Sequence, residues 1–174
     1  MTIDPVDVRD LLGQPGLSRS VHLEGTLEGL GTEVATLAPG EPVRGELLLE
    51  SVVEGILVSA TLAGSLALRC ARCLKEFERP IAVEVSELFA LAPDPDDEDV
   101  YVLDPEGWLD PEQMVRDAFG LELPFSPLHS PDCQGLCPVC GGDRNLGECP
   151  GDHPQVDPRW GDLELVLHDL EDRI

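Results

Sequence analysis

The sequence is poor in aromatic side chains and in basic ones. Only 4% of its 174 residues are aromatic, so the core must be built from Val, Leu, Ile and Ala. Lysine and arginine together number 11 against 35 acidic residues, which gives a formal net charge of −24. Because such a surface repels phosphate, the composition excludes a protein that coats nucleic acid through a general phosphate affinity. The charge indicates either a well-solvated acidic surface or a basic partner, and any contact with RNA must be local.

Long apolar runs are also missing. The most apolar region, residues 51–68, is interrupted by Glu54 and by several serine, threonine and glycine residues, and it alternates as a pair of strands would. The first ten residues are acidic and lack the basic start and apolar stretch of a secretory signal. With 42% hydrophobic and 26% charged residues, the composition is that of a globular protein. We therefore expect a cytoplasmic protein without a membrane span.

Recognisable catalytic motifs are absent as well. The sequence contains no Walker loop, no G-x-G-x-x-G and no Ser-His-Asp grouping that can be argued for, so we expect no enzymatic activity. What it does contain is six cysteines, four of them within the stretch from Cys133 to Cys149. In a reducing cytosol these are poor candidates for structural disulfides, so metal ligation or redox chemistry is the leading explanation.

Alternating patterns over the first two thirds of the chain predict an antiparallel sheet of roughly six strands. In residues 21–28, Val21, Leu23 and Leu27 fall on one face, while His22 and two glutamates fall on the other. Similar segments follow at 43–51, 54–64, 65–70, 81–91 and 99–103. This number of strands would also allow a barrel-like closure of the sheet.

Helical signals occur in two places. Asp4 as N-cap, Pro5 at the first helical position and Gly13 near the end predict a short helix at the start of the chain. One main amphipathic helix is predicted at residues 110–121, where Asp110, Pro111 and Gln113 form a capping-box-like start and the apolar residues that follow share one face.

The fold class is therefore α+β, with an antiparallel sheet, one main helix and a C-terminal zinc-knuckle module. Residues 1–128 would form the β-rich core with its helix, residues 129–158 the zinc-binding module, and residues 159–174 an acidic C-terminal tail with the pattern of a last strand or docking segment. The acidic, Pro-containing stretch from Ala92 to Val100 is typical of an exposed hairpin loop.

The segment Cys137-Pro-Val-Cys140-Gly-Gly has the form of a zinc knuckle. Two thiolates three residues apart can ligate one ion, while the glycines allow backbone amides to turn towards the sulfurs. Tetrahedral zinc needs two further ligands, and Cys149 and His153 supply them at a suitable spacing. The sequence therefore predicts one zinc ion held by these four residues.

Cys70-Ala-Arg-Cys73 is a second knuckle, placed where one predicted strand ends. A redox CxxC pair usually opens a helix, whereas this one lies at a strand turn with Pro80 soon after it. As a metal site it needs two more ligands, and His129 and Cys133 are the remaining candidates. His129 is the weakest of them, because a lone histidine in a loop is more often only hydrogen-bonded.

Two alternatives to a pair of zinc sites stay open. A single zinc ion could be held by Cys133, Cys137, Cys140 and Cys149, which would leave the first knuckle as free thiols. The first knuckle could also serve a thiol oxidoreductase.

Basic residues gather around the first knuckle. Four of the chain's 11 lysines and arginines lie within eleven positions there. They are Arg69, Arg72, Lys75 and Arg79. A rigid metal turn is a good platform for presenting such groups to phosphate, which predicts an RNA or partner contact. The alternative is that these cations only neutralise zinc-bound thiolates or pair with Glu76 and Glu78.

Together these motifs resemble the YceD family of bacterial large ribosomal RNA subunit accumulation proteins. The resemblance rests on LRCARCLKEFERPI, an acidic break, a single helix and PLHSPDCQGLCPVCGGDRN, and it covers about residues 47–158. It implies a non-enzymatic factor that supports 23S rRNA processing or accumulation during large-subunit assembly. The implied partners are large-subunit rRNA or its precursor, a basic ribosomal protein, or both. A zinc-stapled adaptor for an unrelated protein is the remaining alternative.

The residues of this chain match both family motifs. Those of the first are Cys70, Arg72 and Cys73, and those of the second are Gly135, Leu136, Cys137, Pro138, Cys140 and Gly141. The chain departs from the family in having His129 where cysteine is often found, and Cys149 followed by His153 in place of a Cys-x-Cys ending. Histidine can replace cysteine as a zinc ligand, so the resemblance still implies both sites.

Overall fold

The computed structural model describes residues 3–92 and 100–153. They belong to two compact units, Met1–Pro131 and a second unit that begins at Asp132. Most of the predicted acidic loop between Ala92 and Val100 lies outside the described residues, as does the predicted tail 159–174. Within the described part of the chain, no helix is both long and apolar enough to cross a membrane.

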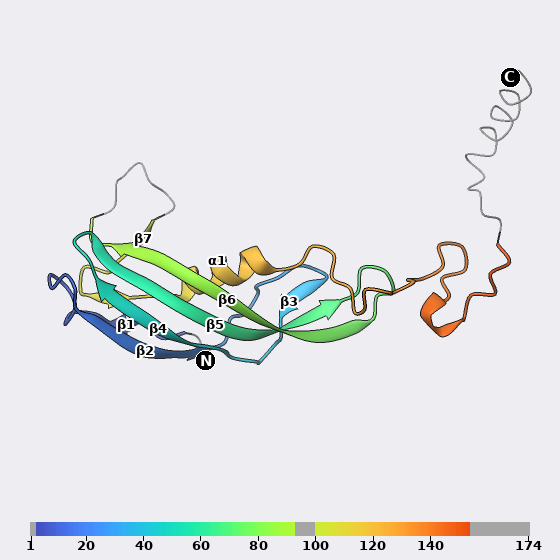
Figure 1. The fold of residues 1–174 in the computed structure, drawn as a ribbon, viewed down its shortest axis with the longest axis horizontal. Coiled ribbons are helices and arrows are strands. Elements are labelled where there is room, and N and C mark those ends of the chain that lie inside the picture. The colour runs from blue at the N-terminus through green and yellow to red at the C-terminus, as the bar shows by residue number, and fades with distance from the viewer. Residues whose placement is uncertain (1–2, 93–99, 154–174) are drawn as a thin grey trace, which may run out of the picture. The chain divides into compact units, whose positions relative to one another are not determined.

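The first unit is built on a six-stranded sheet (Figure 1). Its strands are β2 (Ser18–Gly25), β3 (Ala35–Leu37), β4 (Val43–Ser51), β5 (Gly55–Arg69), β6 (Glu76–Ala90) and β7 (Tyr101–Val102). They follow the order β2-β4-β5-β6-β7, with β3 pairing beside β5. All pairs are antiparallel except β6 with β7. The predicted α+β class is confirmed, but the sheet is open: no described pairing joins β2 to β7, so a barrel is not formed.

The long β5–β6 hairpin dominates this sheet. Its two strands pair without interruption from Gly55 with Ala90 to Arg69 with Glu76. The prediction of separate strands at 54–64 and 65–70 was wrong, because Gly64 does not break β5. Instead, its missing side chain makes room for the helix: a Cβ atom there would lie 3.3 Å from Cε1 of Phe119.

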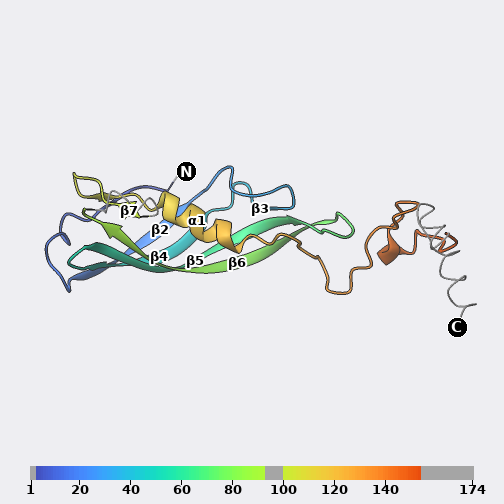
Figure 2. The same ribbon diagram turned by 90° about the horizontal axis from the view of Figure 1, so that it is seen from above.

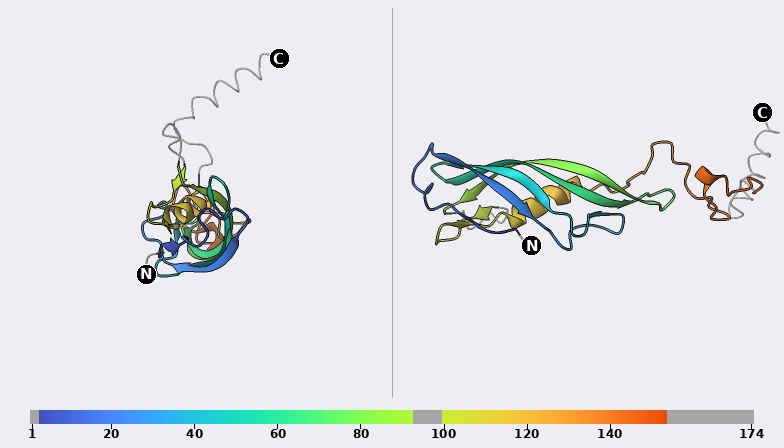
Figure 3. Two further views of the ribbon diagram at one scale, coloured as in Figure 1. Left: turned by 90° about the vertical axis from the view of Figure 1, so that its left-hand side faces the viewer. Right: turned by 90° about the horizontal axis from the view of Figure 1, so that it is seen from below.

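The helix α1 (Glu112–Glu122) packs against β6, and Figures 2 and 3 show the sheet curving around it. Its buried face carries Met114, Val115 and Phe119, as the apolar pattern predicts. The helix begins after Pro111, and the carboxylate of Asp110 accepts from the amide of Glu112 at 3.0 Å, so Asp110 caps the first turn as predicted. The Gln113 half of the predicted capping box is wrong, since its side-chain amide donates to Asp117 at 2.9 Å.

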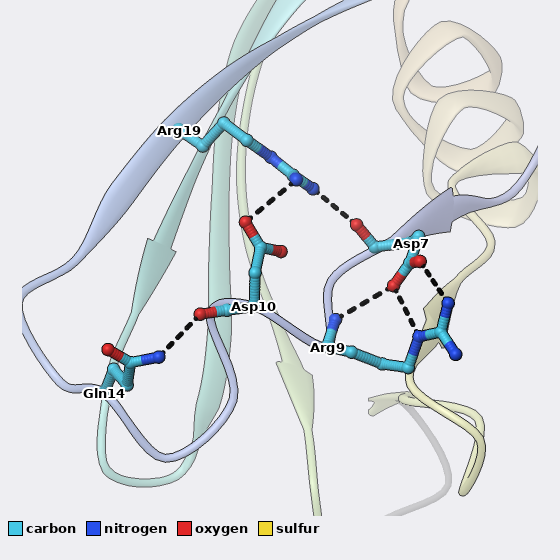
Figure 4. A network of polar contacts seen from close by, with 5 residues as sticks. All are labelled: Asp7, Arg9, Asp10, Gln14 and Arg19. Atoms are coloured by element: carbon cyan, nitrogen blue, oxygen red, sulfur yellow. Dashed lines mark hydrogen bonds and ion pairs between the residues drawn. The ribbon is translucent and has the colours of Figure 1, made fainter.

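The predicted N-terminal helix is also wrong. Val6–Asp7 forms the short strand β1, which pairs antiparallel with β8 (Trp108–Leu109). The carboxylate of Asp7 accepts hydrogen bonds from the amide of Arg9 at 3.1 Å and from its guanidinium at 2.9 Å, and Arg19 donates to Asp10 at 3.0 Å (Figure 4). Such local side-chain to backbone bonds compete with helix formation, and strand pairing decides the outcome.

The core lies between the sheet and the helix. In β2, Leu23 is buried while His22 and Glu24 are exposed, which confirms the predicted faces of that strand. The buried side chains of the described residues are mostly aliphatic; the exceptions are Phe89, Phe119, Met114, the cysteines and Ser51. The core therefore has the composition that the shortage of aromatic residues predicts.

Candidate metal centres and the basic turn

The turn between β5 and β6 carries the first cysteine pair. Cys70 and Cys73 are buried, with exposures of 0% and 8%. The amide of Cys70 donates to the carbonyl of Lys75 at 2.9 Å, and the amide of Leu74 donates back to the carbonyl of Cys70 at 2.9 Å. Leu74 has a φ of 62°, and it is the only described residue other than glycine in the left-handed region.

The second cysteine pair lies in a turn with the same hydrogen bonds. The amide of Cys137 donates to the carbonyl of Gly142 at 2.9 Å, and the amide of Gly141 donates to the carbonyl of Cys137 at 2.8 Å. Gly141 takes the left-handed position, with a φ of 73°. The two turns are therefore equivalent, and Leu74 stands in the first where glycine stands in the second.

His129 is brought to the first turn by the chain that follows the helix. The carbonyl of Pro127 accepts from the amide of Ala71 at 2.8 Å, and the carbonyl of Leu128 accepts from the Arg79 guanidinium at 3.0 Å. As a result, Nδ1 of His129 lies 3.4 Å from Sγ of Cys73. The ligand atoms of Cys70, Cys73 and His129 are all within 4.8 Å of one another.

The first turn favours a thiolate at Cys70. Burial raises the pKa of its thiol, but hydrogen bonds from the His129 side chain and from three backbone amides outweigh burial and lower the pKa from 9.0 to about 5. Two of these amides belong to Arg72 and Cys73. Because the pair joins two strands and does not open a helix, its setting is that of a metal turn and differs from the usual redox CxxC.

In the second unit, Cys137, Cys140, Cys149 and His153 form a group whose ligand atoms lie within 4.8 Å of one another. The amides of Cys140 and Val139 lower the pKa of the Cys137 thiol to about 6, although burial opposes them. The Gly142 amide lowers the pKa of the Cys140 thiol, but burial and the neighbouring sulfurs raise it above its ordinary value. A bound cation would relieve that opposition, since a coordinating thiol loses its proton.

His153 provides a direct test of whether this group suits a metal. Its Nε2 atom is buried and has no hydrogen-bond partner in the described part of the chain. A buried ring nitrogen without a partner is costly, and ligation would satisfy it. Three thiols and one imidazole form an ordinary tetrahedral zinc set, so the residues fit a zinc ion.

Cys133 is a buried residue of the second unit. The side-chain amide of Asn145 donates to its sulfur at 3.6 Å, and the carbonyl oxygen of the same side chain accepts from the amide of Gln134 at 2.8 Å. The four-residue group of this unit contains His153 and does not contain Cys133, which disfavours the single-zinc alternative. The role of Cys133 as the fourth ligand of Cys70, Cys73 and His129 stays a prediction.

The four predicted contact cations of the first turn, Arg69, Arg72, Lys75 and Arg79, are all exposed. The contacts of Arg69 and Arg79 could not be told apart from the sequence pattern. Arg69 lies 3.5 Å from the carboxylate of Glu76, while Arg79 bonds a backbone carbonyl and sits 5.5 Å from the Phe77 ring centroid. The described ion pairs do not include Lys75, whose charge therefore faces solvent.

Comparison with known proteins adds the following. The family model described as "Large ribosomal RNA subunit accumulation protein YceD" matches residues 58–166, a span that contains all six cysteines. Proteins of Mycobacterium tuberculosis and Mycobacterium bovis, each named an uncharacterized protein, are 39% identical over 171 residues, covering 93% of this chain and 80% of the relative. A Mycobacterium leprae protein with the same kind of name is 34% identical over 178 residues, covering 95% and 79%. No solved structure matches the chain.

Proposed function

The chain belongs to the YceD family of large ribosomal RNA subunit accumulation proteins, and on this premise we propose that it supports 23S rRNA processing or accumulation during large-subunit assembly. The observation that carries the proposal is the family match over residues 58–166, which spans both cysteine turns. We propose a non-enzymatic, cytoplasmic factor. Its partners would be large-subunit rRNA or its precursor, a basic ribosomal protein, or both, and the net charge of −24 suits the second.

Two zinc ions form part of this proposal. Cys70, Cys73, His129 and Cys133 would hold one, and Cys137, Cys140, Cys149 and His153 the other. The support comes from the thiol and imidazole donors, the amides directed at Cys70 and Cys137, and the unsatisfied nitrogen of His153. When bound, zinc supplies a fixed positive centre that neutralises the thiolates and braces each turn.

Elemental analysis of the purified protein tests the metal part directly. Two zinc ions per chain, with no titratable thiol before denaturation, are expected. A single zinc ion together with reactive Cys70 and Cys73 thiols would contradict it and would revive the redox alternative.

The first turn is the surface we propose for the RNA contact. An acidic body repels RNA elsewhere, so binding would concentrate where cations project from a braced turn. Because Arg79 holds the carbonyl next to His129, reversing its charge would also disturb the metal centre. Lys75 is free of this complication and is the residue on which a charge test is best made.

The test compares Lys75→Glu with the charge reversal Arg44→Glu, made at a cation that pairs with Glu24 away from the first turn. Arg44 is exposed and pairs opposite Ala63, about 20 Å along β5 from the turn. In cells lacking the wild-type gene, Lys75→Glu should lower co-sedimentation with large-subunit precursors and reduce mature large-subunit RNA, while zinc content and Tm stay unchanged. Arg44→Glu should leave association intact. Full complementation by Lys75→Glu would contradict an RNA contact at this turn. It would favour instead a contact between the acidic surface and a basic ribosomal protein.

A further inference from the structure

Two large apolar side chains are exposed near the C-terminal end of the helix, one within its last turn and one in the loop that follows. Phe125 is 92% exposed and Leu121 is 86% exposed, the two highest values among the exposed large hydrophobic residues of the described chain. The chain has only four phenylalanines, and two of the others form the aromatic part of the core. Aromatic residues usually contribute to a protein core, but a ring as exposed as that of Phe125 does not.

Phe125 is held in place from both sides. Leu123, two residues before it, is buried, and its amide donates to the carbonyl of Gly120 at 3.4 Å. Pro127, two residues after it, is buried, and its carbonyl accepts from the amide of Ala71. With both anchors fixed, the backbone that carries Phe125 is ordered before binding, which limits the entropic cost of a contact.

The second anchor also places Phe125 close to the first turn. Pro127 bonds Ala71, which lies between the two cysteines of that turn, and two extended residues span at most about 7 Å. The next carbonyl along, that of Leu128, is bonded by Arg79. An open aromatic ring and a set of exposed cations therefore lie on the same part of the first unit.

We propose that this surface, made of Phe125 together with Arg72, Lys75 and Arg79, binds single-stranded RNA, with one unpaired base stacked on the Phe125 ring. The inference rests on the proposed function and specifies that the protein contacts an unpaired segment of the large-subunit RNA. An aromatic ring can stack on any base, and the adjacent cations can contact the phosphate backbone of the RNA. The surface would therefore select for single-stranded RNA without selecting for a particular sequence. A duplex keeps its bases stacked inside the helix and offers the ring no free base face.

The experiment measures binding of the full-length, zinc-loaded protein to a short labelled single-stranded RNA and to the same sequence as a duplex, by fluorescence anisotropy at low salt. Phe125→Ala and Phe125→Leu should each weaken single-strand binding about tenfold, within the range of one lost base–aromatic stack. Phe125→Tyr should retain it, since the ring face is kept. Duplex binding should be unchanged by all three. Val53→Ala, at a side chain that is 78% exposed in the opposite hairpin turn, is the matched control and should bind as wild type.

Several outcomes would overturn the inference. Wild-type affinity in Phe125→Leu would mean that the contact is merely apolar. A lower Tm of Phe125→Ala without RNA would mean that the ring packs within the protein. If the wild type binds no single-stranded RNA while Lys75→Glu still lowers co-sedimentation with precursors, the inference falls and the proposed function stands. If the wild type does not associate with precursors at all, both fall.

Discussion

Replacing one cysteine in each proposed metal centre by serine should destabilise the first unit by more than the second. In the first unit, His129 follows Cys73 by 56 residues, so a metal joining them closes a long loop that includes β6, β7 and the helix. In the second unit, Cys149 follows Cys140 by only nine residues. Loop-closure entropy grows as 3/2 RT times the logarithm of loop length, so the long loop stabilises by about 1.6 kcal/mol more than the short one.

The assay combines urea unfolding with hydrogen–deuterium exchange of Cys70→Ser and Cys149→Ser. We expect Cys70→Ser to lower the urea midpoint and to speed exchange in peptides from both β5 and β6. Cys149→Ser should speed exchange only in residues 132–153 and leave the sheet protected. Equal loss of stability in the two variants would refute the reasoning, as would a Cys70→Ser effect confined to residues 70–75.

Three further changes test the local geometry. Gly141→Ala should cost about 1–2 kcal/mol, because alanine is strained in the left-handed conformation, and should therefore lower the Tm and the zinc retention of the second unit. Leu74→Gly should not lower the Tm of the first unit, since glycine takes the same conformation without strain. The opposite ranking would contradict the equivalence of the two turns. The side-chain and amide hydrogen bonds of Arg9 lower the pKa of Asp7 from 3.8 to about 2, so its contribution to stability is complete above pH 3.8 and is lost as pH falls through 2. Acid unfolding of Asp7→Asn should lack this pH-dependent loss, and an unchanged pH profile would argue against the bond. Gly64→Val should cost about 1–3 kcal/mol by overpacking against the helix, measured by urea unfolding, and a neutral result would show that the helix does not sit on Gly64.

The alternation of apolar and polar residues correctly predicted the parts of the fold that are determined within a single strand. The alternation of apolar and polar residues in β2 and β4 predicted which face of each strand is buried, because only one face packs on the core. The merging of 54–70 into one strand could not be predicted, since Gly64 looks like a strand breaker until the helix above it is known. The N-terminal strand was missed because its pairing partner, β8, lies about 100 residues away.

The candidate metal centres also differ in how far local sequence could predict them. The group around Cys137 lies within one short segment, so cysteine and histidine spacing alone was enough to propose it. The approach of His129 to Cys73 depends on backbone bonds from Pro127 and Leu128, which no spacing rule predicts. The left-handed Leu74 was also missed, because leucine rarely takes that conformation and only the hydrogen bonds of the turn reveal it.

The central claim is that this protein acts on large-subunit RNA through the first turn, between β5 and β6. It is tested most directly by crosslinking the protein to RNA in cells and sequencing the RNA that is recovered. The account predicts enrichment of large-subunit rRNA or its precursor, concentrated in unpaired segments and lost in Lys75→Glu. Recovery of no RNA, or of RNA without large-subunit enrichment and unchanged by Lys75→Glu, would contradict it.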